Sequence, residues 1–305
     1  MPKEFDLVVV GEINPDIILR DDDLVPVYGQ TEKLIADADV TVGSSAVIVA
    51  AGAARLGLRV AFIGVVAQDY FADYMLNEMA KLNIDTTAVK TIPGIKSGFS
   101  IIFSKGDRAI LTYAGSIGEL RFQQIDFNVI AKAKHLHLSS YFLLKELQPD
   151  IPKLFRLAKE MGLSTSIDCN WDPKNEWKGI DEALKYTDLL LPNENEMLAL
   201  CKRDSVAEAL TELVETVDIV ALKLGSKGAI AKTKESEISM PSLKVNVVDT
   251  TGAGDSFDAG FLHGYINGFD IERCLRQAII CGSLSTRAVG GTGAQADLAE
   301  MKDFL

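Results

Sequence analysis

The stretch DTTGAGDSFDAG, residues 249–260, places a glycine-rich turn directly before a helical pattern. Beyond this turn the apolar side chains recur at the spacing of one helix face, at Phe257, Phe261, Leu262, Tyr265 and Ile266. The first turn of a helix leaves backbone N–H groups unpaired at the positive end of the helix dipole, and glycines let an anion approach them closely. The stretch therefore predicts an anion site of phosphate size at a helix N-terminus.

Asp255 lies inside this anion-binding turn. A carboxylate repels a bound phosphate, so a site built only to hold anions would avoid one. The carboxylate is useful if it takes a proton from a hydroxyl group that attacks the phosphorus. The alternative interpretation is a capping carboxylate at the start of a helix.

On either side of this stretch, short apolar strands alternate with helical patterns over most of the chain. Strands are predicted at 5–11, 60–65, 135–138, 164–168, 188–191 and 218–222, and helices at 45–57, 69–82, 148–161, 194–201 and 205–216. Continuous apolar strands joined by crossover helices are typical of a parallel sheet that is covered on both faces. We therefore expect one α/β domain over residues 1–305, with a central, mostly parallel sheet and helices on both faces.

Two segments, about 12–42 and 88–114, interrupt this alternation with β-rich sequence. The second contains two β-rich runs around Lys105-Gly106-Asp107, which is typical of a hairpin turn. We expect the two segments to form a small antiparallel sheet that projects from the main domain, as a lid, as the surface of a homodimer, or as both. An edge extension of the main sheet is the alternative.

Composition excludes several classes of function. The 31 basic and 43 acidic residues give a net charge of −12, which disfavours non-specific binding to nucleic acid. The apolar run near the N-terminus is too short, and too closely flanked by acidic residues, for a signal peptide. No apolar stretch reaches the length of about 18 residues that spans a membrane. We therefore expect a cytoplasmic protein that binds a small molecule.

The string at 249–260 resembles the C-terminal motif of the ribokinase-like (PfkB) carbohydrate kinase family almost letter for letter. The resemblance implies a ribokinase-like fold and ATP-dependent phosphorylation of a hydroxyl group on a sugar or a sugar-like small molecule. It also implies that Asp255 is the catalytic base. The backbone N–H groups of Gly252, Ala253 and Gly254 would form the anion hole for the transferred phosphoryl group.

Two further segments resemble motifs of the same family, in the family's order along the chain. LPNENE, residues 191–196, resembles its Asn-x-x-Glu motif, which implies that Asn193 and Glu196 organise Mg²⁺ and the ATP phosphates, with Mg²⁺ held through water. Taken alone, NENE is equally a plausible helix start. DCNWDPKNEW, residues 168–177, resembles the Asp-x-Asn segment of many members, and Asn170 would approach the phosphates.

A third segment, KLGSKG at residues 223–228, resembles the family's nucleotide-binding turn after a strand. The resemblance implies that Gly225, Ser226 and Gly228 lie near ATP, whereas the alternative is a plain β-turn. Asp249, with the backbone of residues 290–291, stands where some members bind K⁺. The implied cofactors are therefore ATP and Mg²⁺, with K⁺ as a further hypothesis.

The acceptor side resembles the family less closely. In GEINPD, residues 11–16, Asp16 matches an aspartate that binds substrate hydroxyls, and Asn14 belongs to the same segment. In GSSAVI, residues 43–48, Gly43 matches a second motif, but Ser44 replaces a usual glycine and Ile48 a usual asparagine. We expect Asn14, Asp16, Gly43 and Ser44 to bind the acceptor, which the sequence leaves open among ribose, fructose, 2-keto-3-deoxygluconate and nucleosides.

Other nucleotide-binding classes lack their defining motifs in this chain. The sequence has no GxxxxGK[ST] and no GxGxxG after the first strand, which excludes P-loop and dinucleotide-binding sites. The remaining alternatives are a nucleoside kinase of the same fold and a non-catalytic sugar or nucleotide sensor, and the presence of Asp255 disfavours the sensor. Ile279 and Ile280 stand where members often have asparagine, which predicts a more apolar adenine pocket and leaves exclusive use of ATP open.

His135 and His137 alternate with leucines on a predicted strand and would share one face of it. Two metal ligands or a buried structural pair would both fit this pattern.

Overall fold

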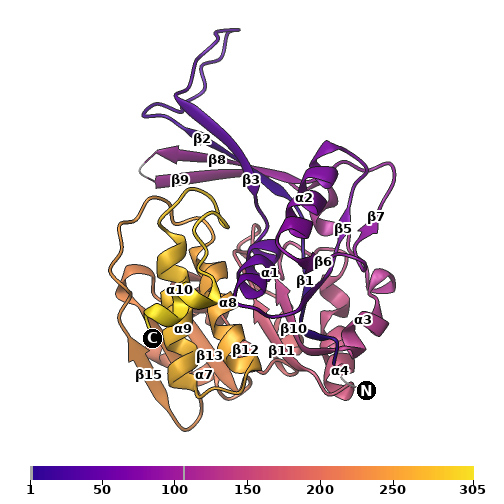
Figure 1. Ribbon diagram of the computed structural model, residues 1–305, viewed down its shortest axis with the longest axis vertical. Helices are drawn as coiled ribbons and strands as arrows, with labels where there is room; N and C mark the ends of the chain where they lie inside the picture. The colour runs from indigo at the N-terminus through magenta and orange to yellow at the C-terminus, as the bar shows by residue number, and fades with distance from the viewer. Residues whose placement is uncertain (1–2, 106) are drawn as a thin grey trace.

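A nine-stranded sheet forms the centre of the computed structural model, which describes residues 3–105 and 107–305 (Figure 1). Its strand order is β15-β14-β13-β12-β11-β10-β1-β4-β6. Every neighbouring pair from β13 to β6 is parallel, and β14 and β15 continue the sheet antiparallel at one edge. The strands are β1 Phe5–Val10, β4 Val60–Ile63, β6 Ile84–Asp85, β10 Ala133–Ser139, β11 Ser164–Asp168, β12 Leu189–Leu190, β13 Ile219–Lys223, β14 Ala229–Lys232 and β15 Glu237–Met240.

Helices cover both faces of this sheet, so the predicted α/β fold is confirmed. On β1, Val8 and Val10 enter the core on one face, and Leu7 and Val9 enter the core on the other. The first face is covered by α3 Phe127–Ala131, α4 Ile151–Glu160, α5 Asp181–Leu184, α6 Glu194–Cys201 and α7 Val206–Leu213. The second is covered by α1 Ser45–Arg55, α2 Tyr70–Lys81, α8 Ala253–Ile266 and α9 Ile271–Ser285, with α10 Leu298–Asp303 packed on α9.

A separate four-stranded sheet projects from one end of the main domain (Figure 1). We call it the small sheet; its order is β3-β2-β8-β9, with bounds Asp37–Val42, Pro15–Arg20, Phe99–Lys105 and Asp107–Tyr113. The expectation that it is wholly antiparallel is wrong, because the central pair, β2 and β8, is parallel. These two strands come from two separate excursions of the chain that leave the main domain in the same direction. The hairpin of β8 and β9 forms as predicted, and its turn at Gly106 lies outside the described residues.

Smaller elements complete the chain. Within the expected range 88–114, β7 Lys90–Thr91 pairs with β5 Val65–Val66 and not with the small sheet. Single turns of 3-10 helix occur at Gly115–Gly118, Phe122–Gln124, Gln148–Asp150 and Gly225–Lys227. Among the described residues, none of the helices combines the length and apolar character needed to cross a membrane.

The order of the strands positions a crevice at one edge of the main sheet. The chain proceeds from β1 to β4 on one side, whereas β10 pairs on the other side. In an open parallel sheet such a reversal leaves a space at the carboxyl ends of the strands, where ligands bind. Backbone packing is tight here, because a Cβ on Gly11, just after β1, would lie 2.3 Å from the Cβ of Ala46 in α1.

Candidate active site

A cavity of about 720 Å³ opens at this carboxyl edge, beside the N-terminus of α8. Its lining comes from loops after several strands and from the starts of two helices. Nine of the residues that the sequence singled out line it together: Asn170, Asn193, Glu196, Gly225, Ser226, Gly228, Ala253, Gly254 and Asp255. Two more, Ser44 and Gly252, each directly precede a lining residue.

The turn before α8 has a conformation that requires glycine. Gly252 is the N-cap residue and has φ 71°, in the left-handed region. A Cβ at Gly252 would lie 2.6 Å from the Cα of Gly291, so the two glycine segments touch. Both carboxylate oxygens of Asp249 fix this contact: Oδ1 accepts from the backbone N of Thr251 at 2.9 Å, and Oδ2 accepts from the backbone N of Gly290 at 2.9 Å. The residue that was hypothesised to bind K⁺ thus fastens the two loops together.

Asp255 lies in the first turn of α8 and is 8% exposed. Burial, with the negative charge of Asp168, raises the pKa of Asp255 to about 7, although Lys223 and the hydroxyl of Ser45 act in the opposite direction. A carboxyl group with a pKa near neutrality is well matched to accepting a proton at physiological pH. The same residue also faces the charge of Glu12 at the end of β1.

Asn193 and Glu196 begin α6 in a reciprocal pair. The side-chain Oδ1 of Asn193 accepts from the backbone N of Glu196 at 2.9 Å, and Oε2 of Glu196 accepts from the backbone N of Asn193 at 2.9 Å. The helix-start interpretation and the ligand interpretation of NENE are therefore compatible, because this geometry fixes a carboxylate that lines the cavity. Burial, with the charge of Asp168, raises the pKa of Glu196 to about 7.

The acidic groups at this edge have the chemistry that Mg²⁺ prefers, which is hard oxygen donors. Ligand atoms of Asp168, Cys169 and Glu196 lie within 4.8 Å of one another. Burial raises the pKa of the Cys169 thiol well above its usual value, so this sulfur stays protonated. Asp168 is ion-paired with Lys223 at 2.9 Å. Glu196 is therefore the carboxylate in this group that is best suited to face a cation.

A buried charge cluster, which the sequence interpretation missed, lies beneath the N-terminus of α8. Nζ of Lys223, at the end of β13, lies 2.9 Å from Oδ2 of Asp168 and 3.1 Å from both carboxylate oxygens of Asp258. The side chains of Lys223, Asp168 and Asp258 are 11%, 3% and 0% exposed. The feature that could have indicated this cluster is Lys223 itself, a lysine that directly follows four buried residues in β13.

Part of the cavity lining is apolar. Ile279, which the sequence placed in the adenine region, belongs to this part, whereas Ile280 packs into a separate small core with α10. The other apolar lining residues are Leu243, Val245, Val247 and Phe257.

The residues expected to bind the acceptor do not line this cavity, but they come together where the small sheet joins the main domain. Asp16, at the start of β2, is 7% exposed. Gly43 has no room for a side chain, because a Cβ there would lie 2.3 Å from Oδ1 of Asp16. The hydroxyl of Ser44 caps α1 and donates to the backbone carbonyl of Glu12 at 2.6 Å, and the amide of Asn14 donates to the Pro15 carbonyl at 3.3 Å.

Glu12 is an acceptor-side residue that the sequence interpretation did not single out. Its side chain is 3% exposed, and Oε2 has no hydrogen-bond partner among the described residues. Burial raises the pKa of Glu12, although the hydroxyls of Ser140 and Ser44 partly offset this effect. Asn170, in turn, donates to the Ser140 hydroxyl at 2.7 Å and has φ 53°.

The two strand histidines have a structural arrangement. His135 lies between the hydroxyls of Ser164 and Ser166, each at 2.7 Å, and His137 lies between Ser166 at 2.7 Å and Ser139 at 2.9 Å. All four ring nitrogens are therefore engaged by serine hydroxyls. Burial holds the pKa of both imidazoles below the usual value, so both stay neutral.

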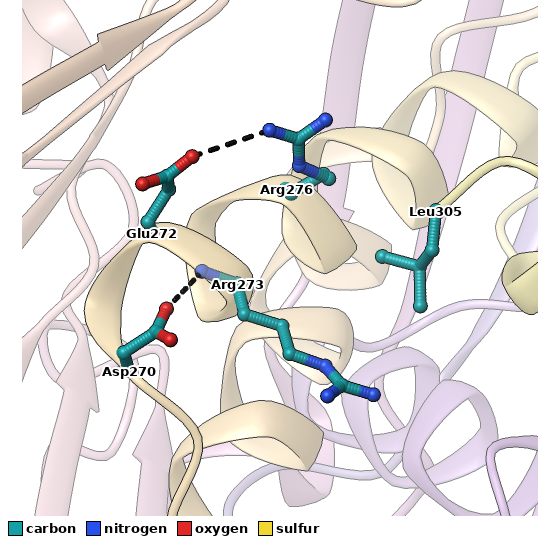
Figure 2. A pocket seen from close by; sticks show the side chains of 5 residues that line it. All are labelled: Asp270, Glu272, Arg273, Arg276 and Leu305. Atoms are coloured by element: carbon teal, nitrogen blue, oxygen red, sulfur yellow. Dashed lines mark hydrogen bonds and ion pairs between the residues drawn. The ribbon is translucent and has the colours of Figure 1, made fainter.

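Figure 2 shows a second hollow, which lies on the surface where α9 begins. Its polar groups already have partners: Asp270 accepts from the backbone N of Arg273 at 2.8 Å, and Glu272 pairs with Arg276 at 3.3 Å. Leu305 forms its other wall. The hollow contains none of the residues discussed above.

The fold and the cavity define a ribokinase-like α/β protein, and comparison with known proteins agrees. Residues 4–297 match the pfkB family carbohydrate kinase domain. The chain is 36% identical over 230 residues to an uncharacterized sugar kinase of Archaeoglobus fulgidus, covering 74% of this chain and 90% of that protein. It is 27% identical over 309 residues to the deoxyribokinase of Salmonella typhi, covering 98% of both chains.

Solved structures give the same result. A protein designated ribokinase II from E. coli, in complex with ATP and Mg²⁺, has a TM-score of 0.87 at 25% identity, with 98% of both chains covered. The adenosine kinase of Sinorhizobium meliloti has a TM-score of 0.87 at 25% identity, with 98% of this chain and 99% of that chain covered. The chain therefore belongs to the pfkB family of carbohydrate kinases, and it is an ATP-dependent sugar kinase.

Proposed function

We propose that this protein transfers the γ-phosphoryl group of ATP to a hydroxyl group of a small sugar, with Asp255 as the base. The observation that carries the proposal is the position of Asp255, in a turn that combines an anion-binding helix N-terminus with a carboxyl group of pKa about 7. Such a turn serves phosphoryl transfer better than anion binding alone.

In this mechanism, the acceptor hydroxyl gives its proton to the carboxylate of Asp255 as its oxygen forms a bond to the γ-phosphorus. The bond from the γ-phosphorus to the bridging oxygen breaks, and ADP leaves. The backbone N–H groups of Gly252, Ala253 and Gly254 stabilise the negative charge of the transferred group. Glu196 and Asn193 would hold Mg²⁺, through water, which neutralises charge on the ATP phosphates when it is bound.

The nucleotide would occupy the rest of the cavity. The turn that contains Gly225, Ser226 and Gly228 lies at its wall, as does Asn170. Leu243, Val247 and Ile279 offer apolar surface to a purine base.

The acceptor would bind beneath the small sheet. Asp16 pairs in register with Thr41 of β3 and Ser100 of β8, so three polar side chains lie together. Carboxylate and hydroxyl groups of this kind recognise an uncharged polyol, because each substrate hydroxyl then finds a hydrogen-bond partner. Asn14, Gly43 and Ser44 would shape this end. The likeness to an adenosine kinase keeps a nucleoside as the second candidate acceptor.

We further propose that the small sheet acts both as a lid and as the surface of a homodimer. Strand register places Ile17, Val40, Ile101 and Leu111 on one face, opposite the face that carries Asp16. Val40 is 46% exposed and Leu111 is 62% exposed. An apolar face of this kind is typical of a contact surface, and a second copy of the chain offers a matching one.

A coupled assay of ADP release tests the proposed reaction. The acceptors are 2-deoxyribose, ribose, 5-dehydro-2-deoxygluconate, ribose 1-phosphate and adenosine, which the names of relatives suggest. Each reaction is compared with one that lacks acceptor, and ³¹P NMR identifies the product. We expect acceptor-dependent ADP release with at least one uncharged sugar. ADP release that no acceptor stimulates would contradict the proposal.

A further inference from the structure

The ammonium group of Lys223 lies directly below the anion-binding turn. A Cβ built on Gly254 would lie 3.6 Å from Nζ of Lys223. The N-terminus of α8 is itself the positive end of a helix dipole. The Lys223 ammonium adds a second positive charge at this point, which is unfavourable unless negative groups face it. Two positive charges together are useful where a strongly anionic group must be held.

Three carboxyl groups face this single ammonium group. Ligand atoms of Asp168, Asp255 and Asp258 all lie within 4.8 Å of one another. Carboxylates at such distances cannot all be ionised, so at least one retains its proton. Burial raises the pKa of Asp258 well above its usual value. Asp258 is therefore the protonated member, and it donates its hydrogen bond to Asp168.

Asp168 is then the ionised partner of Lys223. Burial opposes its ionisation, but Lys223 and the hydrogen bond from Asp258 hold the pKa of Asp168 below the usual value. Lys223 stays charged in return, because the negative charge of Asp168 opposes the effect of burial and raises the pKa of Lys223. The pair is thus a fixed positive charge and a fixed negative charge, both next to the proposed base.

Asp255 is surrounded by groups from four elements. Asp168 faces it from β11, Lys223 from β13, Glu12 from the end of β1 and the Ser45 hydroxyl from α1. Asp168 and Glu12 favour the protonated form of Asp255, whereas Lys223 and Ser45 favour the ionised form. Burial is the main cause of the raised pKa of Asp255, and the balance between Lys223 and Asp168 then adjusts its proton affinity.

We propose that Lys223 is a positioning residue for phosphoryl transfer, which fixes the floor of the anion hole and keeps Asp255 able to accept a proton. This inference rests on the proposed function of Asp255. Lys223 itself makes no bond to the substrate in this role. It acts through Asp255 and through the turn at Gly254.

The test measures the titration of Asp255 without any acceptor. ¹³C NMR follows protein labelled at aspartate side-chain carbons from pH 5 to pH 9, and Asp255→Asn identifies the resonance. We expect Lys223→Met to raise the titration midpoint of Asp255 by about one pH unit or more, because it removes a neighbouring positive charge. Asp168→Asn should lower the midpoint by a similar amount.

Two more variants distinguish the effect of a changed charge on the titration of Asp255 from the effect of a folding defect. The double variant Lys223→Met with Asp168→Asn removes both charges, so it should fold and should return the midpoint close to that of the parent. Lys223→Arg should also keep the midpoint near that of the parent. Lys227→Met is the matched control, because Lys227 is exposed in the turn that follows and pairs with Glu194 at 3.1 Å.

Opposite shifts in the two single variants, with restoration in the double variant, would support the inference. A midpoint that stays unchanged in Asp168→Asn and in the double variant would overturn it, as would shifts of the same sign in both single variants. Turnover assays then separate the two proposals. If the shifts occur but no acceptor is phosphorylated, the proposed function fails, whereas turnover without the shifts overturns the role of Lys223.

Discussion

The main sheet and the small sheet differ in what they leave exposed, even where their strands have the same length, as β1 and β3 do. All six residues of β1 are buried, whereas four of the six residues of β3 are exposed. In the main sheet, polar groups below α8 are paired with one another, as His135 is with Ser166. In the small sheet, apolar side chains such as Leu111 stay open to solvent.

This difference indicates a division of roles between the two sheets. Helices of the same chain cover both faces of the main sheet, so the geometry of Asp255 and its neighbours depends on packing within that chain. The small sheet leaves one face for something outside the chain, which we propose is a second copy. Changes in the main sheet should therefore alter catalysis or stability, whereas changes on the outer face of the small sheet should alter assembly.

Apart from replacement of Asp255 itself, the largest expected effect is on turnover, from Gly252→Ala. A Cβ at Gly252 would meet Gly291 at 2.6 Å in a residue with φ 71°, so the turn must move. Loss of a well-placed anion-hole donor lowers kcat by about 10²- to 10³-fold.

Gly268→Ala is the matched control for that variant. Gly268 follows α8 with φ 73°, and a Cβ there meets nothing within 4 Å. Both variants carry a similar backbone cost, and steady-state kinetics should show a loss of kcat for Gly252→Ala alone. Equal kinetics for the two variants would contradict the anion hole.

The next effect concerns stability, and it depends on pH. Burial raises the pKa of Asp255 to about 7 in the folded chain, above the ordinary value of 3.8. Between these values the folded state holds a proton that the unfolded state has released. Rising pH therefore removes stability through this group, by up to about 1.4 kcal/mol per pH unit.

Asp255→Asn removes this loss, so it should stabilise the protein more at pH 8 than at pH 5. Urea unfolding at the two pH values measures the difference in the free energy of unfolding. Asp22→Asn, in an exposed loop, is the control for the change of charge. If the gain in stability is the same at both pH values, the buried titration of Asp255 is wrong.

A smaller effect is expected within the main sheet from Ser166→Ala. The hydroxyl of Ser166 lies between His135 and His137 and has a single proton, so it donates to at most one imidazole and accepts from at least one. Its removal leaves buried ring nitrogens without partners, which costs about 1–3 kcal/mol.

Urea unfolding should show that loss for Ser166→Ala, with kcat unchanged. Ser164→Ala is the matched control, because Ser164 is only half-buried and water can replace its hydroxyl. An equal loss of stability for both variants would count against the buried histidine pair as the cause.

The smallest effect on the folded chain is expected from Val40→Thr combined with Leu111→Thr on the small sheet. Threonine suits strands, and both side chains are exposed, so stability should change by less than about 0.5 kcal/mol. Light scattering after size exclusion should show a dimer for the parent protein and a monomer for the variant. A parent protein that is monomeric at all concentrations would refute the proposed dimer.

Local patterns predicted much of the fold. FDLVVV is apolar on both faces, which indicated a buried parallel strand, and the structure shows β1 buried on both sides. The spacing after Gly254 predicted α8, which begins at Ala253 and ends at Ile266. Both features depend on neighbours within a few residues, which a single sequence displays.

Long-range pairing was harder to predict. Nothing local indicates that β2 and β8 run parallel, because they are separated by about eighty residues of chain. Lys223 meets Asp168 and Asp258 across 55 and 35 residues, so the charge cluster is visible only once β11, β13 and α8 are assembled. The residues near the glycine-rich turn were found because a resemblance to a known motif supplied this missing information.

The most direct test of the central claim compares the parent protein with Asp255→Asn in the same acceptor-dependent assay. Asparagine keeps the shape of the side chain but cannot accept the proton. We predict that kcat falls by about 10²- to 10⁴-fold, while the affinity for ATP, measured by calorimetry, stays within a few-fold of the parent. Turnover near that of the parent protein would show that Asp255 is not the base.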